Sequence, residues 1–194
     1  MNLYKQNHRL RTFCVKKKVG LFLLNSIIIF LSEFDCLTLR LVFMHILVLQ
    51  HAEEEHPGSF RKFLKEDGHT WDAIELDRGE KLPLIDSYDA LWVMGGPMDV
   101  WEEEKYPWLR TEKEFIRMAV AEKGLPYFGV CLGHQLLADA LGGKVEKSKC
   151  PEIGILDVHQ TPDGQAGVFL DGLPDTFATL QWHSAEVTAI PDGT

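Results

Sequence analysis

The sequence has few cysteines, and their positions form no recognised pattern. Cys14, Cys36, Cys131 and Cys150 are scattered along 194 residues, with no C-x-x-C pair and no histidine spacing suited to zinc. This distribution indicates neither a disulfide framework nor a metal site. A reducing, cytoplasmic setting is the expected location of such a chain.

Positive charge is also scarce, and so are the glycine-rich motifs that hold phosphate groups. The net charge is −9, and residues 1–43 are net basic, so the remainder of the chain is strongly acidic. An acidic surface argues against a nucleic-acid partner. The sequence contains neither a phosphate-binding loop nor a dinucleotide fingerprint. We therefore expect no cofactor.

No apolar run is long enough to cross a bilayer. Lys16–Leu31 has a basic flank and then about 13 mostly apolar residues, the length of a signal-peptide core. No small-residue cleavage site follows, and Met44 opens a strand-like run, MHILVLQ. We interpret residues 1–43 as upstream translation or a dispensable extension, and residues 44–194 as the domain. A membrane anchor and a signal peptide are the alternatives, and we expect no membrane partner.

From Met44 onward, apolar runs alternate with amphipathic segments joined by short connections. The pattern predicts strands at 45–50, 71–76, 88–97 and 126–130, and helices at 57–67, 107–123 and 133–141. Such alternation is typical of an α/β fold with a mostly parallel sheet covered on both faces. Ligands of such sheets bind beyond the carboxyl ends of the strands.

One of these strand ends, GVCLG at Gly129–Gly133, has the pattern of a nucleophile elbow. The tight turn from strand to helix strains the central residue, and glycines on both sides avoid collisions. Cys131 would lie at a helix N-terminus, where the macrodipole favours the thiolate that attacks a carbonyl carbon. A small buried hydrophobic residue is the other interpretation of this cysteine.

A second strand end carries the run MGGPMDVWE, Met94–Glu102. Two glycines and a proline allow the backbone N–H groups of this loop to approach a bound carbonyl oxygen. Acyl transfer requires such donors because negative charge develops on that oxygen. An ordinary turn explains the same residues equally well.

Four segments together resemble the class I glutamine amidotransferase family. They are GGP at 95–97, GVCLGHQLLADALGG at 129–143, EIG at 152–154 and LQWHSAEV at 180–187. The resemblance covers residues 44–194 and is greatest to the stand-alone branch related to the GMP synthase amidotransferase domain and to γ-glutamyl peptidases. It implies a flavodoxin-like α/β fold with a mostly parallel, doubly wound sheet.

The resemblance also implies roles for residues near the elbow. Cys131 corresponds to the family's nucleophile, which forms a γ-glutamyl thioester, and the N–H groups of Gly96 and Leu132 correspond to the oxyanion hole. Gln135 corresponds to a glutamine beside the bound substrate. His134 matches a frequent family residue that is not the base.

The substrate's amino-acid end would lie against the backbone of Trp182, His183, Ser184 and Ala185. The family places its base in an H-x-E motif beyond Thr194, so we expect a fold that is incomplete at its C-terminus and has an exposed sheet edge. Within the chain, His183 is the best candidate base, with Glu186 three residues later, although it matches a position that shapes the pocket.

At position 185 the related synthases usually have an aspartate that holds the substrate's α-amino group. This chain has Ala185, and Glu186 is one candidate to replace the missing carboxylate.

Three functions follow as hypotheses. The first is a glutamine amidotransferase or glutaminase that hydrolyses a γ-glutamyl amide through a cysteine thioester and passes ammonia to a synthase partner. The second is a γ-glutamyl peptidase or hydrolase with the same chemistry. The third is a non-catalytic binding module. The expected ligand in each case is glutamine or another small γ-glutamyl compound, with no cofactor and no metal.

Overall fold

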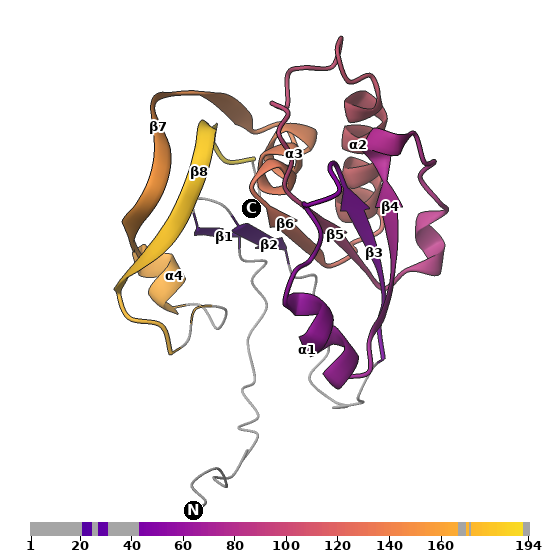
Figure 1. The fold of residues 1–194 in the computed structure, drawn as a ribbon, viewed down its shortest axis with the longest axis horizontal. Coiled ribbons are helices and arrows are strands. Elements are labelled where there is room, and N and C mark those ends of the chain that lie inside the picture. Colours follow the sequence, from indigo (N-terminus) through magenta and orange to yellow (C-terminus); the bar gives the residue numbers. More distant parts are fainter. Residues whose placement is uncertain (1–20, 25–26, 31–42, 167–169, 171, 192–194) are drawn as a thin grey trace, which may run out of the picture.

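The computed structural model describes residues 21–24, 27–30, 43–166, 170 and 172–191. At its centre are four parallel strands in the spatial order β6, β5, β3, β4 (Figure 1). Their bounds are His45–Gln50 for β3, Thr70–Glu75 for β4, Ala90–Val93 for β5 and Tyr127–Val130 for β6. This parallel sheet, with helices on both faces, confirms the predicted α/β fold class.

Alternate side chains of β3 face opposite layers of helices. Leu47 and Leu49 belong to a core shared with α2 (Trp108–Arg117) and α3 (Leu132–Ala140). Ile46 and Val48 belong to a smaller core with Leu64 of α1 (Phe60–Glu66). Because successive residues of a strand point to opposite faces, a strand covered on both sides must be apolar throughout. This explains the uninterrupted run ILVL in β3.

The helices that cover the sheet were all predicted, and their bounds differ by a few residues. The predicted helix at 107–123 is α2 followed by a π-helical turn, η3 (Met118–Glu122). Two short 3-10 helices, η1 (Leu76–Arg78) and η2 (Ile85–Ser87), connect β4 to β5. The strand predicted at 88–97 is shorter, because the backbone leaves the sheet at Met94 to form the Gly-Gly-Pro loop.

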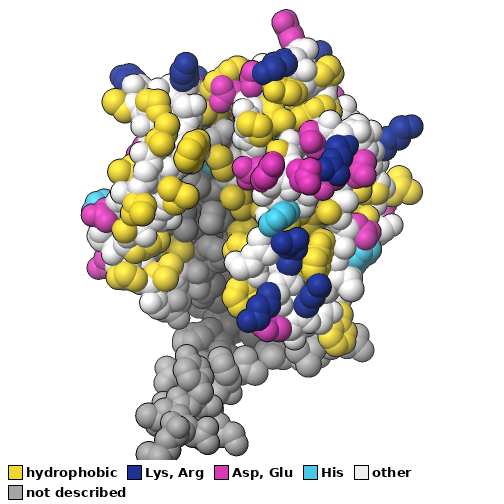
Figure 2. Space-filling view, viewed as in Figure 1, with side chains coloured by type: hydrophobic (Ala, Val, Ile, Leu, Met, Phe, Trp, Pro, Cys, Tyr) yellow, Lys and Arg dark blue, Asp and Glu magenta, His cyan; other side chains and the backbone are white. Residues whose placement is uncertain are grey.

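The region after α3 forms a long two-stranded antiparallel ribbon that the sequence patterns did not predict. Its strands are β7 (Lys144–His159) and β8 (Thr176–Ala189), with α4 (Pro162–Ala166) between them in the chain. The ribbon stands beside α3, away from the parallel sheet (Figure 1). Hydrophobic side chains gather over it (Figure 2). Four exposed ones are cross-strand neighbours: Ile153 with Trp182, and Ile155 with Leu180.

Two further strands lie within the segment that the sequence analysis separated from the domain. They are β1 (Leu21–Leu24) and β2 (Ile27–Phe30), and β2 pairs antiparallel with β6. The edge of the parallel sheet at β6 is thus occupied by β2 rather than exposed. The division of the chain at residue 44 stays a prediction.

No helix among the described residues combines the length and the hydropathy needed to span a membrane.

We predict that Gly133→Ala lowers the free energy of unfolding by about 3 kcal/mol, because overpacking forces backbone shifts. A Cβ at Gly133 would collide with the carbonyl group of Val93. Gly142→Ala is the matched control, since Gly142 has φ +88° but open space around it. We expect this control to cost about 1 kcal/mol from backbone strain alone. Urea unfolding of both variants is the measurement, and equal losses would contradict the collision at Val93.

Candidate active site

Cys131 lies between β6 and α3 in a strained backbone conformation. Its φ of 50° and ψ of −105° lie outside the regions that L-residues favour. It is the sole non-glycine residue with a positive φ in the described part of the chain. Such conformations persist only where the surrounding structure imposes them, and they are typical of functional sites. The predicted elbow therefore has the expected geometry.

The glycines that flank the elbow allow α3 to begin directly against the sheet. A Cβ at Gly129 would lie 2.8 Å from the carbonyl carbon of Gly133 and 2.8 Å from the backbone nitrogen of His134. The Gly133 N–H donates to the Met94 carbonyl over 3.1 Å, and its own carbonyl accepts from the Tyr127 hydroxyl over 2.7 Å. Side chains at 129 or 133 would separate the helix from the strands and relax the turn.

The Gly-Gly-Pro loop after β5 packs directly against the elbow. A Cβ at Gly95 would lie 3.8 Å from the Cβ of Cys131, and one at Gly96 would lie 2.9 Å from Cδ2 of Leu132. The structure thus brings together three of the predicted residues, Cys131, Gly96 and Leu132. The role of the two N–H groups as an oxyanion hole stays a prediction.

The protonation of Cys131 differs from the sequence-based expectation. Burial raises the pKa of the Cys131 thiol, the Leu132 N–H group lowers it, and the negative charge of Glu55 raises it further, with a net increase. The expected stabilisation of the thiolate by the helix N-terminus is therefore outweighed by desolvation. The thiol form predominates at neutral pH in the protein without a ligand.

Gln135 connects the elbow helix to the ribbon. Its side-chain Nε2 donates to the Ala185 carbonyl over 3.4 Å, and both residues are buried. Ser184 is partly buried beside them, whereas the side chain of Trp182 is 74% exposed opposite Ile153. Of the predicted substrate residues, Gln135 and Ala185 are thus in contact, whereas the Trp182 side chain is exposed.

His183 has both ring nitrogens engaged with acceptors of the ribbon. Nδ1 lies 3.2 Å from the Ala185 carbonyl oxygen, and Nε2 lies 3.0 Å from a carboxylate oxygen of Glu152 and 3.2 Å from Oε1 of Gln181. The carboxylate beside His183 is therefore that of Glu152 and not that of Glu186. This arrangement fits a residue that shapes the pocket better than one that accepts a proton from Cys131.

Glu186 does not provide the carboxylate missing at position 185. Ala185 is buried, whereas Glu186 is exposed and lies opposite Glu146. Successive side chains of a strand point to opposite faces, so Glu186 faces away from α3. This orientation does not support the idea that Glu186 compensates for Ala185, which stays a prediction.

Glu55, in the loop after β3, is a carboxylate that the sequence analysis did not place at the site. A Cβ at Gly95 would lie 2.6 Å from Oε2 of Glu55, so this oxygen borders the Gly-Gly-Pro loop beside Cys131. Its charge raises the pKa of both Cys131 and His51. No sequence motif identifies Glu55 as a residue of the site, because its carboxylate comes close to Gly95 only through the folded path of the loop after β3.

A buried pair, His51 and Glu112, lies behind the same loop and was also missed. Nδ1 of His51 is 2.7 Å from the Gly95 carbonyl oxygen, and Nε2 is 2.9 Å from Oε1 of Glu112. Both side chains are completely buried, and the Trp108 ring stacks on His51 at 5.5 Å. A usable signal was present: His51 follows a buried strand, and Glu112 interrupts the apolar face of α2.

His134 is buried, and neither ring nitrogen has a hydrogen-bond partner within the described residues. Burial lowers its pKa to about 4, and the neighbouring charge of His183 acts in the same direction. The ring is therefore neutral near pH 7. Among the residues that the structure describes, no group of three or more His, Cys, Asp or Glu side chains is arranged to hold a metal ion.

The family model described as "Glutamine amidotransferase class-I" matches residues 64–194. A glutamine amidotransferase-like protein of Salmonella typhimurium, YfeJ, is 30% identical over 145 residues, which are 73% of this chain and 60% of that protein. A glutamine-hydrolysing GMP synthase component of Sulfolobus acidocaldarius is 29% identical over 122 residues, 63% of this chain and 60% of that protein. The chain thus spans about three fifths of the length of these relatives.

Solved structures of glutamine amidotransferases are also similar to this chain. A glutamine amidotransferase from Thermotoga maritima has a TM-score of 0.67 and 34% identity, with 74% of this chain and 62% of that one covered. A glutamine amido transferase from Methylobacillus flagellatus has a TM-score of 0.69 and 34% identity, with 78% and 59% covered.

The neutral, buried His134 predicts a pH dependence of stability. Its pKa is about 4 in the folded protein and near 6.5 in an unfolded chain, so between these values the unfolded chain carries more protons. The free energy of unfolding should therefore fall by on the order of 3 kcal/mol as pH decreases from about 6.5 to about 4. Urea unfolding should show this slope reduced in His134→Met and unchanged in His159→Gln, an exposed control. An unchanged slope in His134→Met would exclude His134 as its source.

The effect of Glu55 on Cys131 predicts a change in thiol reactivity. Glu55→Gln removes a charge that raises the Cys131 pKa, so alkylation of Cys131 by iodoacetamide at neutral pH should become about 2- to 5-fold faster. Glu54→Gln, an exposed neighbour, is the control and should have no effect. In the unmodified chain, exposed Cys150 should react before Cys131. Mass mapping of peptides measures both rates, and equal Cys131 rates in the two variants would contradict this electrostatic effect.

Proposed function

This chain belongs to the class I glutamine amidotransferase family, and from that premise we propose that it hydrolyses a γ-glutamyl amide through a thioester on Cys131. The sulfur attacks the γ-carbonyl carbon, the carbon–nitrogen bond breaks, and the nitrogen leaves with a proton as ammonia or an amine. Water then attacks the thioester, which releases glutamate and restores the thiol.

The observation that carries this proposal is the strained backbone of Cys131 at the start of α3, in contact with the Gly-Gly-Pro loop. The strain holds the sulfur at the carboxyl end of β6, where ligands of parallel sheets bind. The Leu132 N–H contacts the Cys131 side chain, and Gly96 packs against Leu132. The N–H groups of these two residues would stabilise the oxyanion of the tetrahedral intermediate. The proposed chemistry requires neither a metal nor a cofactor.

The contact between Gln135 and Ala185 supports a substrate site at this end of the molecule. It joins the first turn of α3 to β8, so a ligand bound beside Cys131 would also meet the backbone of 182–185. We assign the substrate's amino-acid end to that backbone. His183 is assigned to the shape of this pocket, because its nitrogens are engaged with Glu152, Gln181 and Ala185.

A specific observation favours γ-glutamyl peptides or conjugates as alternative substrates. Ala185 provides no carboxylate for the α-ammonium group, and Glu186 faces away. Because the pocket lacks that carboxylate, we expect γ-glutamyl peptides to be cleaved at least as well as free glutamine.

One similar protein is named as part of a GMP synthase. The proposal that this chain is a glutamine amidotransferase therefore includes a synthase partner that receives the ammonia.

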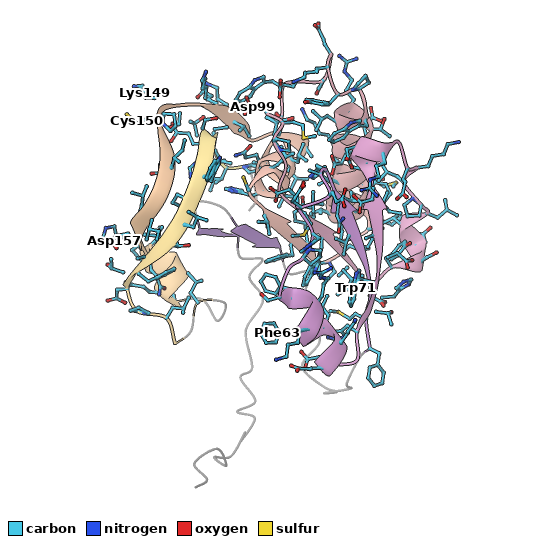
Figure 3. All side chains as sticks on the ribbon, viewed as in Figure 1. Phe63, Trp71, Asp99, Lys149, Cys150 and Asp157 are labelled. Atoms are coloured by element: carbon cyan, nitrogen blue, oxygen red, sulfur yellow. The ribbon has the colours of Figure 1, made fainter. Side chains whose placement is uncertain are left out.

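We predict that a glutamine-analogue diazo ketone labels Cys131 faster than Cys150, the reverse of the order expected with iodoacetamide. The reason is that binding at the elbow concentrates the reagent beside a thiol that is otherwise less reactive. Figure 3 shows Cys150 on the part of β7 remote from α3, so it serves as an internal control. Equal labelling by the analogue would overturn the proposed site.

Turnover decides between the functions. Incubation with glutamine and with a γ-glutamyl dipeptide, followed by acid quench, should leave one glutamyl group on Cys131, and Cys131→Ser should abolish product release. Cys150→Ser is the matched control and should retain full activity. Faster cleavage of the dipeptide than of glutamine would favour the peptidase. Binding of both compounds without a covalent adduct would instead favour a binding module.

A further inference from the structure

The contact between His51 and Gly95 acts on the peptide unit that contains the Gly96 N–H group. Nδ1 of His51 lies 2.7 Å from the carbonyl oxygen of Gly95. This carbonyl and the Gly96 N–H belong to one planar trans peptide, in which the two groups point in opposite directions. A hydrogen bond that holds the carbonyl toward His51 therefore holds the N–H away from it.

The neighbours of His51 determine which of its nitrogens carry protons. A carbonyl oxygen only accepts hydrogen bonds, so Nδ1 must be the donor to Gly95. Nε2 faces Oε1 of Glu112 at 2.9 Å, and an ionised carboxylate also only accepts. If the Glu112 carboxylate is ionised, both nitrogens of His51 carry protons and the ring is a cation. Burial alone would lower the pKa of His51, but the Glu112 charge and hydrogen bond, the Gly95 carbonyl and the Glu55 charge together raise it.

We propose that His51, paired with Glu112, is a positioning residue that orients and polarises the Gly95–Gly96 peptide as an oxyanion donor. The inference rests on the proposed function, because it assigns a use to the Gly96 N–H in that reaction. A cation bonded to the carbonyl withdraws electron density from the peptide and makes its N–H a stronger donor. The effect is large in a buried site, where screening is weak.

The construction of the pair supports a role beyond packing. His51 and Glu112 are both fully buried, and burial of two charges contributes little net stability. The second carboxylate oxygen of Glu112 is buried with no hydrogen-bond partner in the described part of the chain, which carries a further cost. Trp108, stacked on the ring, excludes water from the pair. A Cβ at Gly96 would lie 2.8 Å from the Cβ of His51, so the loop rests directly on this residue.

Two substitutions of His51 each keep one of its two hydrogen bonds and remove the other, so each bond can be tested on its own. The amide nitrogen of asparagine lies as many bonds from Cα as Nδ1, and that of glutamine as many as Nε2. His51→Asn therefore keeps the donor to Gly95, whereas His51→Gln keeps only the donor to Glu112. With γ-glutamyl-p-nitroanilide as the probe, we expect His51→Gln to lose about 100-fold in kcat with little change in KM. His51→Asn keeps the orientation of the peptide but removes the positive charge, so it should lose less, about 10-fold in kcat. Equal losses in the two variants would overturn the proposal.

A spectroscopic arm does not depend on turnover or on the variants. In the unmodified full chain at neutral pH, the 15N resonances of His51 should show both ring nitrogens protonated, with scalar coupling from Nδ1–H to the Gly95 carbonyl carbon. A neutral ring, or no such coupling, would overturn the proposal. If the unmodified chain hydrolyses no γ-glutamyl compound, the proposed function fails. The spectra still decide whether His51 holds the loop.

Discussion

The close approach of α3 to the parallel sheet is the constraint on which the rest of the structure depends. With no side chain at Gly133, the first turn of α3 rests on the carbonyl of Val93, and the lack of one at Gly129 lets the strand pass beneath that turn. The chain can then reverse within one residue, and Cys131 takes up the strain with φ of 50°. The same contact brings the end of β5 next to the elbow. The Gly-Gly-Pro loop, Cys131 and the start of α3 are thus a single packed unit.

Electrostatics around this unit are set by burial and by carboxylates from other parts of the chain. Glu55 borders the loop on its exposed side and opposes ionisation of Cys131, whereas Glu112 lies behind the loop and stabilises a proton on His51. In the proposed reaction, Cys131 is protonated in the resting protein, and a positive charge on His51, behind the Gly95–Gly96 peptide, would stabilise the negative charge that appears only as the reaction proceeds.

Local patterns predicted the parallel part of the fold because β3, β5 and β6 are mostly apolar and a glycine follows the end of α1, η3 and α3 within two residues. They also located the elbow, since GVCLG combines a cysteine with glycines at the two places where a Cβ would collide. They did not predict the ribbon of β7 and β8. Both of its faces are largely exposed, and four apolar side chains, Ile153, Ile155, Leu180 and Trp182, are exposed on it. Its sequence therefore lacks the burial pattern by which strands are usually recognised.

The sequence by itself determined the α/β class, the succession along the chain of the strands and helices that build the parallel sheet, and the position of Cys131 at a sharp turn. These follow from periodicity and from the placement of glycine over a few residues. Only the tertiary structure decided the partners of the site. His51 and Glu112 are 61 residues apart, Gln135 and Ala185 are 50 apart, and the carboxylate beside His183 proved to be Glu152 rather than Glu186. Side chains so distant in the chain meet only when helices pack on strands, and the pKa values of Cys131 and His51 depend on that packing.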